Sequence, residues 1–142
     1  MNYVYPALFQ PEPDGGFLVT FPDVPEAITQ GDDLPEAMAS AADALGLALR
    51  GYLVDGRSLP TPSEHDGCFD VPVEMANALK IAVVEAFRAA GISKSEFARR
   101  LGKGETEARR ILDPDHPTKL ATLEAALRLL GKQVFVTVKD AA

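Results

Sequence analysis

The first half of the chain alternates apolar and polar residues, a pattern typical of β-strands. Residues 2–10 and 17–21 carry this alternation, and a Pro- and Gly-rich turn at 11–16 separates them. Together they predict a β-hairpin. The same reasoning predicts a short third strand at 27–30 and a fourth at 68–73, with Pro72 placing the fourth at an edge or near its own end.

A helical pattern lies between the third and fourth strands. Asp32, Asp33 and Pro35 are typical of a helix start, and the predicted helix ends near Leu53. Its apolar residues recur at spacings of three and four and are expected to face the sheet: Leu34, Met38, Ala41, Leu45, Ala48 and Tyr52. Leu47 and Leu49 widen this apolar surface and offer a contact for a second subunit.

Beyond residue 74 the apolar spacing is helical until close to the C-terminus. It predicts helices at 75–90, 94–101, 105–112 and 120–130, most of them bounded by glycine. Ser93 and Glu96 predict a capping box at the start of the second of these helices.

The last ten residues return to alternation. Residues 133–139 predict a terminal strand whose apolar residues are Val134, Phe135, Val136 and Val138. A lone strand after four helices needs a pairing edge, and the copy in a two-fold partner is the simplest source. These residues are therefore the predicted oligomerisation site of a dimer or tetramer.

Together these elements predict an α+β fold with two domains. The first, a sheet with one packed helix, spans 1–66, or to about 74 with its last strand. The second, 75–142, is an all-α domain followed by the terminal strand. The sequence has 142 residues and 46% hydrophobic content, enough for real cores.

Charge divides along the same line. Residues 1–74 hold two basic and thirteen acidic residues, a net charge of 2 − 13 = −11. The rest holds twelve basic and eight acidic residues, 12 − 8 = +4, and the two halves sum to −7. A basic half suits a polyanion such as DNA and an acidic half suits a basic protein. Two solvated surfaces that differ by chance are the alternative.

The second and third of the four predicted helices, joined by Gly102, Lys103 and Gly104, have helix-turn-helix spacing. The later helix would present its first turn to the major groove of DNA. The predicted DNA-binding residues are Lys94, Lys103, Glu105, Thr106, Arg109, Arg110 and Lys119. Arginine can pair with a guanine edge through two hydrogen bonds, and lysine supplies a point charge to phosphate. A structural helical bundle with a solvated basic face is the alternative.

The acidic half raises the possibility of a metal-dependent nuclease. Its predicted first two strands carry no acid, and the carboxylates lie in turns or at the helix start, whereas converging metal ligands need rigid positions. We therefore predict no metal, no cofactor and no enzymatic activity. On charge alone, the predicted contacts to a basic protein are Asp14, Asp23, Asp32 and Asp33.

Other chemistry is sparse. His65 and His116 lie in separate Pro-rich loops without a partner at ligand spacing, and no Ser/His/Asp arrangement, phosphate-binding glycine loop or zinc pattern is present. The one cysteine, Cys68, fits a reducing cytosol. No apolar run approaches the ~20 residues that span a bilayer. We expect a cytoplasmic protein without membrane contact.

Several of these segments resemble HicB-type antitoxins. The resemblance lies in YPA at residues 5–7, DGGFLVTFPDVP at 14–25, TQGD at 29–32 and LPTPS at 59–63. FARRLG at 97–102, ILDP at 111–114 and LEAAL at 123–127 resemble the lambda-repressor-type helix-turn-helix that many HicB proteins carry.

The resemblance implies a partly degenerate RNase H-like N-terminal domain that lacks nuclease activity. It implies that this domain covers the catalytic face of a HicA-like toxin, a small basic mRNA interferase, and that the C-terminal domain binds operator DNA of its own operon as a dimer or larger oligomer. Carried over, the DNA readers are Lys94, Thr106 and Arg110, with Glu105. Lys103 departs from the pattern, because an apolar residue is usual after Leu-Gly. A stand-alone transcription regulator with a ligand-sensing N-terminal domain is the competing hypothesis.

Overall fold

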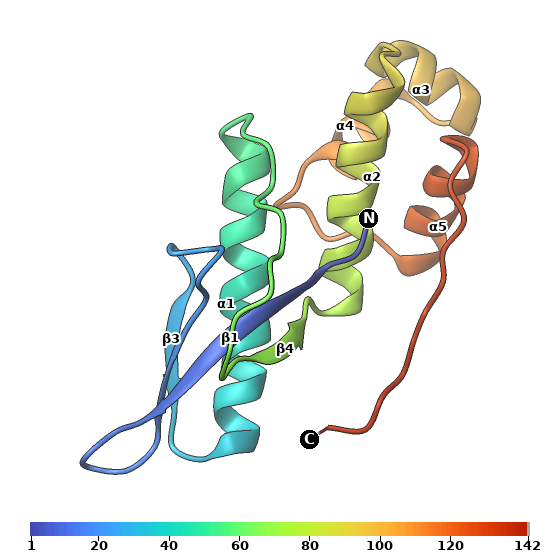
Figure 1. Ribbon diagram of the computed structural model, residues 1–142. Coiled ribbons are helices and arrows are strands. Elements are labelled where there is room, and N and C mark those ends of the chain that lie inside the picture. The colour runs from blue at the N-terminus through green and yellow to red at the C-terminus, as the bar shows by residue number, and fades with distance from the viewer. Residues whose placement is uncertain (142) are drawn as a thin grey trace.

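The computed structural model describes residues 1–141, which form a four-stranded sheet with one long helix packed on it and a group of four shorter helices beside it (Figure 1). The strands are β1 (Val4–Pro11), β2 (Phe17–Thr20), β3 (Ile28–Gly31) and β4 (Phe69–Pro72). They are antiparallel throughout, in the order β3-β2-β1-β4. The helices are α1 (Leu34–Val54), α2 (Met75–Ala90), α3 (Lys94–Leu101), α4 (Glu105–Leu112) and α5 (Leu120–Leu129).

Most predicted elements are confirmed within one or two residues. The β1–β2 hairpin has the expected loop, and α2, α3 and α4 have the predicted bounds. The expected surface role of Leu49 is wrong, because this side chain is fully buried in the sheet core, whereas Leu47 is 62% exposed. Leu49 is four residues from both Leu45 and Leu53, so all three face the sheet.

The terminal strand predicted at 133–139 is absent from the single chain. Residues 132–141 are irregular and exposed, and Figure 1 shows this tail running from α5 past α2 toward the sheet. Side-chain alternation alone does not make a strand, because each strand needs an edge to which its backbone can hydrogen-bond. The edges of this sheet are β3 and β4, and the tail pairs with neither.

The first core lies between one face of the sheet and α1. The sheet contributes Tyr5, Ala7, Phe9, Val19 and Val71, which alternate along their strands as a one-sided sheet requires. The helix contributes Ala37, Ala41, Leu45, Leu49 and Leu53. Small alanines near the start of α1 allow the helix to approach the sheet closely.

Helix α2 takes part in two cores. Its residues Ile81 and Val84 pack in the sheet core. Ala82, Val83 and Ala86 pack in a second core with Phe97 and with residues of the other helices: Ala98, Ala108, Ile111, Leu112, Leu123, Ala126 and Leu127. The connection from β4 to α2 is only Val73 and Glu74, and the Val73 amide donates to the Tyr3 carbonyl at 2.9 Å. The helical group is therefore fixed to the sheet.

The long loop between α1 and β4 is tied down by tyrosines from the core. The Tyr5 hydroxyl donates to the Pro60 carbonyl of this loop at 2.6 Å, and the Tyr52 hydroxyl donates to Glu26 of the β2–β3 loop at 2.6 Å. The Arg57 guanidinium lies 4.0 Å from the centre of the Tyr52 ring, a cation–π contact. None of the helices in the described residues is long and apolar enough to cross a membrane.

Gly31 marks the closest approach of β3 to α1. A Cβ at this position would lie 2.6 Å from Ala37 Cα and would also clash with the Ala37 backbone nitrogen. Both are main-chain atoms of the first helical turn, so no side chain can move aside. A larger residue must push the end of β3 away from α1.

We therefore expect Gly31→Ala to lower the free energy of unfolding by roughly 1–3 kcal/mol, the usual cost of overpacking. Gly51→Ala is the matched control, because a Cβ there meets no atom within 4 Å. That change should raise the free energy of unfolding by about 0.5–1 kcal/mol, as expected inside a helix. Urea denaturation of both variants measures the difference, and equal midpoints would contradict the close approach.

Candidate functional site

Helices α3 and α4 are joined by a short turn and have well-defined ends. The Ser93 hydroxyl accepts from the Glu96 amide at 3.0 Å and so caps α3. At the other end Gly102 has φ 69°, and the Lys103 amide donates to the Ala98 carbonyl at 3.0 Å. Glycine adopts this left-handed conformation without strain, which allows the tight turn into α4.

The capping box predicted at Ser93 is only half formed. Instead of reaching back to Ser93, the Glu96 carboxylate accepts from Arg99 at 2.6 Å and from Arg100 at 2.9 Å. These hydrogen bonds lower the pKa of Glu96 to about 2. Two arginines of α3 are therefore already partnered, even though both are exposed.

Four of the seven predicted DNA-binding residues line one cleft beside α4 and the start of α5. They are Lys103, Thr106, Arg110 and Lys119, and the cleft has a volume of about 590 Å³. Thr106 and Arg110 are four residues apart and share a face of α4. Glu107 also lines the cleft and pairs with Lys103 at 3.2 Å. Within residues 1–141, Arg110 and Lys119 have no ion-pair partner.

The structure does not bring the other three predicted residues into this cleft. Glu105 accepts from the Ser95 hydroxyl at 2.6 Å and lies 3.7 Å from Arg109, so both α4 side chains are engaged along the helix pair. Lys94 is exposed at the start of α3. The cations available at the cleft are therefore fewer than the sequence pattern implied.

Sequence reasoning missed Lys80 on α2. Its Nζ donates to the Ile111 carbonyl at 2.8 Å, to the Arg110 carbonyl at 3.1 Å and to the Thr118 hydroxyl at 2.6 Å. Burial lowers the pKa of this lysine to about 8, and the Asp113 charge opposes the shift. A signal existed: Lys80 is four residues after Ala76 and three before Val83, in the middle of the apolar stripe.

The predicted protein-binding acids fall at two ends of the sheet. Asp14 lies in the β1–β2 loop, and Asp32 and Asp33 follow β3, which the pairing of Phe17 with both Pro11 and Gly31 places at the same end. With Glu12 and Glu36 we call these residues the acidic end. Asp33 also caps α1 by accepting from the Glu36 amide at 2.9 Å.

Asp23 lies at the opposite end of the sheet, in the loop between β2 and β3. Its carboxylate accepts from the Ser63 amide at 2.9 Å and from the Ser63 hydroxyl at 2.6 Å, and His65 Nε2 lies 3.2 Å away. Partial burial acts to raise the pKa of Asp23, but these hydrogen bonds outweigh it and the pKa is lowered. Asp23 therefore holds the α1–β4 loop in place.

The expectation that His65 has no partner and that no Ser/His/Asp arrangement exists is wrong, since Asp23, Ser63 and His65 meet. The arrangement is not a proton relay. In a catalytic triad the two ring nitrogens of histidine bind the serine and the aspartate separately. Here Nε2 contacts both, and the Ser63 hydroxyl donates directly to Asp23. Within the described part of the chain, no three His, Cys, Asp or Glu side chains are arranged to hold a metal.

The predicted oligomerisation residues lie on the irregular tail. Val134, Phe135 and Val136 line a hollow of about 460 Å³ together with residues 1–4 and α2. Phe135 is nevertheless 86% exposed and Val138 90% exposed. Exposed apolar side chains in an unpaired segment are suited to contact with another chain.

Comparison with known proteins finds relatives along most of the chain. Residues 4–82 match the family model described as HicB-like antitoxin of bacterial toxin–antitoxin systems. Antitoxin HicB of Escherichia coli strain K12 is 39% identical over 94% of this chain and 98% of its own length. Antitoxin HicB 1 of Photorhabdus laumondii is 35% identical over 97% and 88%, respectively. A solved toxin–antitoxin complex from Streptococcus pneumoniae contains a chain that is 32% identical, with coverage of 45% and 46% and a TM-score of 0.41.

Proposed function

This chain belongs to the HicB-like antitoxin family of bacterial toxin–antitoxin systems, and we propose that it masks a HicA-like toxin with its sheet domain and represses its own operon with its helical domain. The observation that carries the toxin half is the family match at residues 4–82, which spans the sheet, α1 and the first half of α2. The same region holds nearly all the excess negative charge.

We place the toxin contact at the acidic end. Asp14 and Asp32 are exposed there, and their carboxylates are free of ion pairs within residues 1–141. Asp23 was predicted on the same charge argument, but it is occupied by Ser63 and His65 at the far end of the sheet. The negative electrostatic potential of the acidic end would attract a small basic mRNA interferase over a long range.

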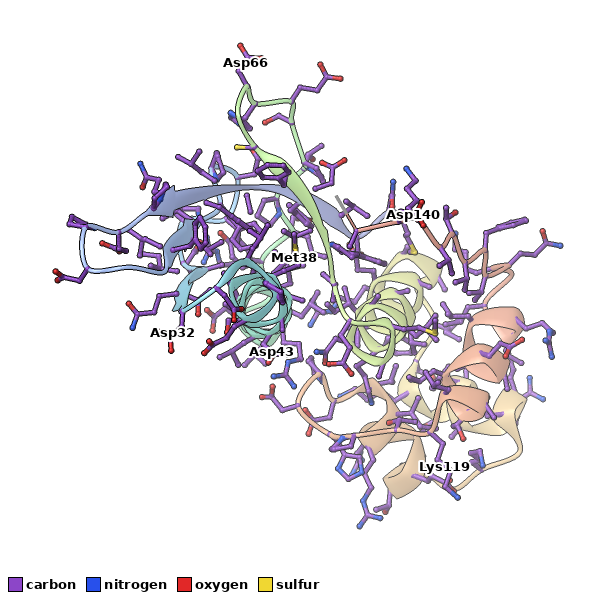
Figure 2. All side chains as sticks on the ribbon, turned by 90° about the horizontal axis from the view of Figure 1, so that it is seen from below. Asp32, Met38, Asp43, Asp66, Lys119 and Asp140 are labelled. Atoms are coloured by element: carbon purple, nitrogen blue, oxygen red, sulfur yellow. The ribbon has the colours of Figure 1, made fainter. Side chains whose placement is uncertain are left out.

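We expect Asp14→Asn with Asp32→Asn to slow toxin association several-fold at low salt and to weaken its salt dependence. The reason is that the two substitutions remove two negative charges but keep polar side chains of the same size. Asp43→Asn with Asp66→Asn is the matched control, because these acids lie outside the acidic end; Figure 2 shows Asp32 and Asp66 far apart. Stopped-flow binding to the basic protein encoded beside this gene measures the rates.

If both double variants slowed association equally, the toxin contact would not be at the acidic end, although toxin binding itself would stand. If no basic neighbour co-purifies with this chain and no inhibition of RNA cleavage occurs, the toxin half of the proposal fails. The stand-alone regulator hypothesis would then lead.

Operator binding is supported by the cleft beside α4. Arg110 lies on the same face of α4 as Thr106, and Lys119 lies across the cleft from them. An exposed arginine that has no ion-pair partner in residues 1–141 is suited, at this position of a helix-turn-helix, to reading a guanine edge, and the lysines are suited to phosphate. Glu105 and Arg109, being paired with each other, contribute less to the proposed readout.

Arg110→Ala should weaken binding to the DNA directly upstream of the gene by ~1–3 kcal/mol and relax sequence preference at one position. Arg128→Ala, which removes the same charge from an α5 arginine paired with Glu124, is the control and should change affinity little. Fluorescence anisotropy with the upstream fragment and with a shuffled fragment measures both. Unchanged discrimination in the Arg110 variant would reject the base-reading role.

Self-association through the tail completes the proposal. The tail residues Phe135 and Val138 are exposed in one chain. Val134, Val136 and Val138 are spaced by two as in a strand, and a second copy offers the missing edge. Deleting residues 133–142 should lower the mass of the assembly in light scattering, while toxin capture is retained. An unchanged mass would place the self-association surface elsewhere.

A further inference from the structure

Lys80 is the one charged side chain that residues 1–141 bury, with 3% of its surface exposed. Its hydrogen-bond partners are far away in the sequence, on α4 and on the loop before α5. All three ammonium protons are used, two on carbonyls and one on a hydroxyl. The side chain thus joins three separate segments of the helical domain.

The two carbonyls belong to the last turn of α4, where backbone acceptors have no partner within the helix. The C-terminal end of a helix also carries partial negative charge, which a buried cation complements. Only one backbone amide, that of Asp113, bonds to the Arg110 carbonyl in this turn, at 3.2 Å. Lys80 therefore supplies most of the polar contacts that fix this helix end.

The residues that accept hydrogen bonds from Lys80 also line the cleft. One is the main-chain oxygen of Arg110 itself, and another is the hydroxyl of Thr118, the residue before Lys119. Arg110 and Lys119 are the two cleft cations that lack ion-pair partners among the described residues. Lys80 thus holds the main chain of Arg110 and the side chain of the residue that precedes Lys119.

We propose that Lys80 is a positioning residue for operator binding, which holds the backbone of Arg110 and the side chain of Thr118 so that Arg110 and Lys119 keep a fixed spacing across the cleft. The inference rests on the operator binding proposed above. It adds a determinant of specificity that lies outside the DNA-facing surface.

Lys80 acts through the α4 backbone and the Thr118 side chain and not by touching DNA. It does not line the α4–α5 cleft; it lines a smaller hollow of about 140 Å³ on another side of the 113–119 turn. The charged or titratable groups around it there are Arg50 from α1, with Asp115 and His116 from the turn. Because its charge is buried, it releases no counterion on binding, and its loss should leave the salt dependence of binding unchanged.

The test is Lys80→Met, which keeps the length of the side chain but cannot donate. At pH 7, we expect the upstream DNA fragment to bind about tenfold more weakly, the loss that one misplaced base contact produces. Affinity for a shuffled fragment should stay within twofold of wild type, and the slope of log affinity against log salt concentration should not change. Both depend on the number of phosphate contacts, and Lys80 makes none. Lys132→Met, which changes an exposed lysine three residues beyond α5, is the control.

A double-mutant cycle separates positioning from a general structural role. If Lys80 acts through Arg110, Lys80→Met should cost little further affinity in the Arg110→Ala background. A change that only destabilises the domain would add its full effect in both backgrounds. Full additivity would overturn the proposal.

Thr118→Val gives a second, milder variant if Lys80→Met does not give a cooperative unfolding transition. It removes one acceptor of the ammonium without changing charge, and we expect a smaller but selective loss of affinity for the upstream fragment. If a folded Lys80→Met variant still discriminates between the upstream and shuffled fragments as wild type does, this inference is overturned and the proposed operator binding stands. If only Thr118→Val folds, the same result in that variant has the same meaning. If wild type itself does not prefer the upstream fragment, the proposed operator binding fails and this inference with it.

Discussion

The two-sided burial of α2 is the constraint on which the rest of the structure depends. Ile81 and Val84 complete the sheet core, while Val83 and Ala86 complete the helical core. A helix that is apolar on two faces is stable only when both faces are covered. The sheet core and the helical core therefore share a structural element, although the two halves of the chain carry opposite charge and their proposed partners differ.

Charge pairing within helices decides which cations remain for a partner. Glu96 holds Arg99 and Arg100, Glu105 holds Arg109, and Glu124 holds Arg128. Such exposed pairs contribute little to stability, about 0.3–0.5 kcal/mol each on a helix. Their larger effect is on recognition, because they leave Arg110 and Lys119 as the most available positive charges around the cleft.

Local patterns predicted most of the fold, and contacts between distant segments account for what they missed. The hairpin and the four C-terminal helices follow from spacing, capping residues and glycines, all of which act over a few residues. The pairing of His65 with Asp23 spans 42 residues and that of Lys80 with Thr118 spans 38, so neither partner can be found from local sequence, although the position of Lys80 in an apolar stripe indicates that it is buried. The terminal strand failed for a related reason, because alternation at Val134 and Val136 specifies a face but supplies no edge. Of the predicted DNA-binding set, position along the chain anticipated that Arg110 is exposed on α4 but could not show that Arg109 is engaged by Glu105.

The two-residue connection between β4 and α2 has a mechanical consequence. Val73 is buried and bonded to Tyr3, so the link is a rigid elbow instead of a flexible tether. A ligand on the sheet and a ligand on the helices would be held at one fixed distance and orientation. The relative placement of the two ligands is then a property of the fold itself and does not depend on an effective concentration set by the length and flexibility of a linker.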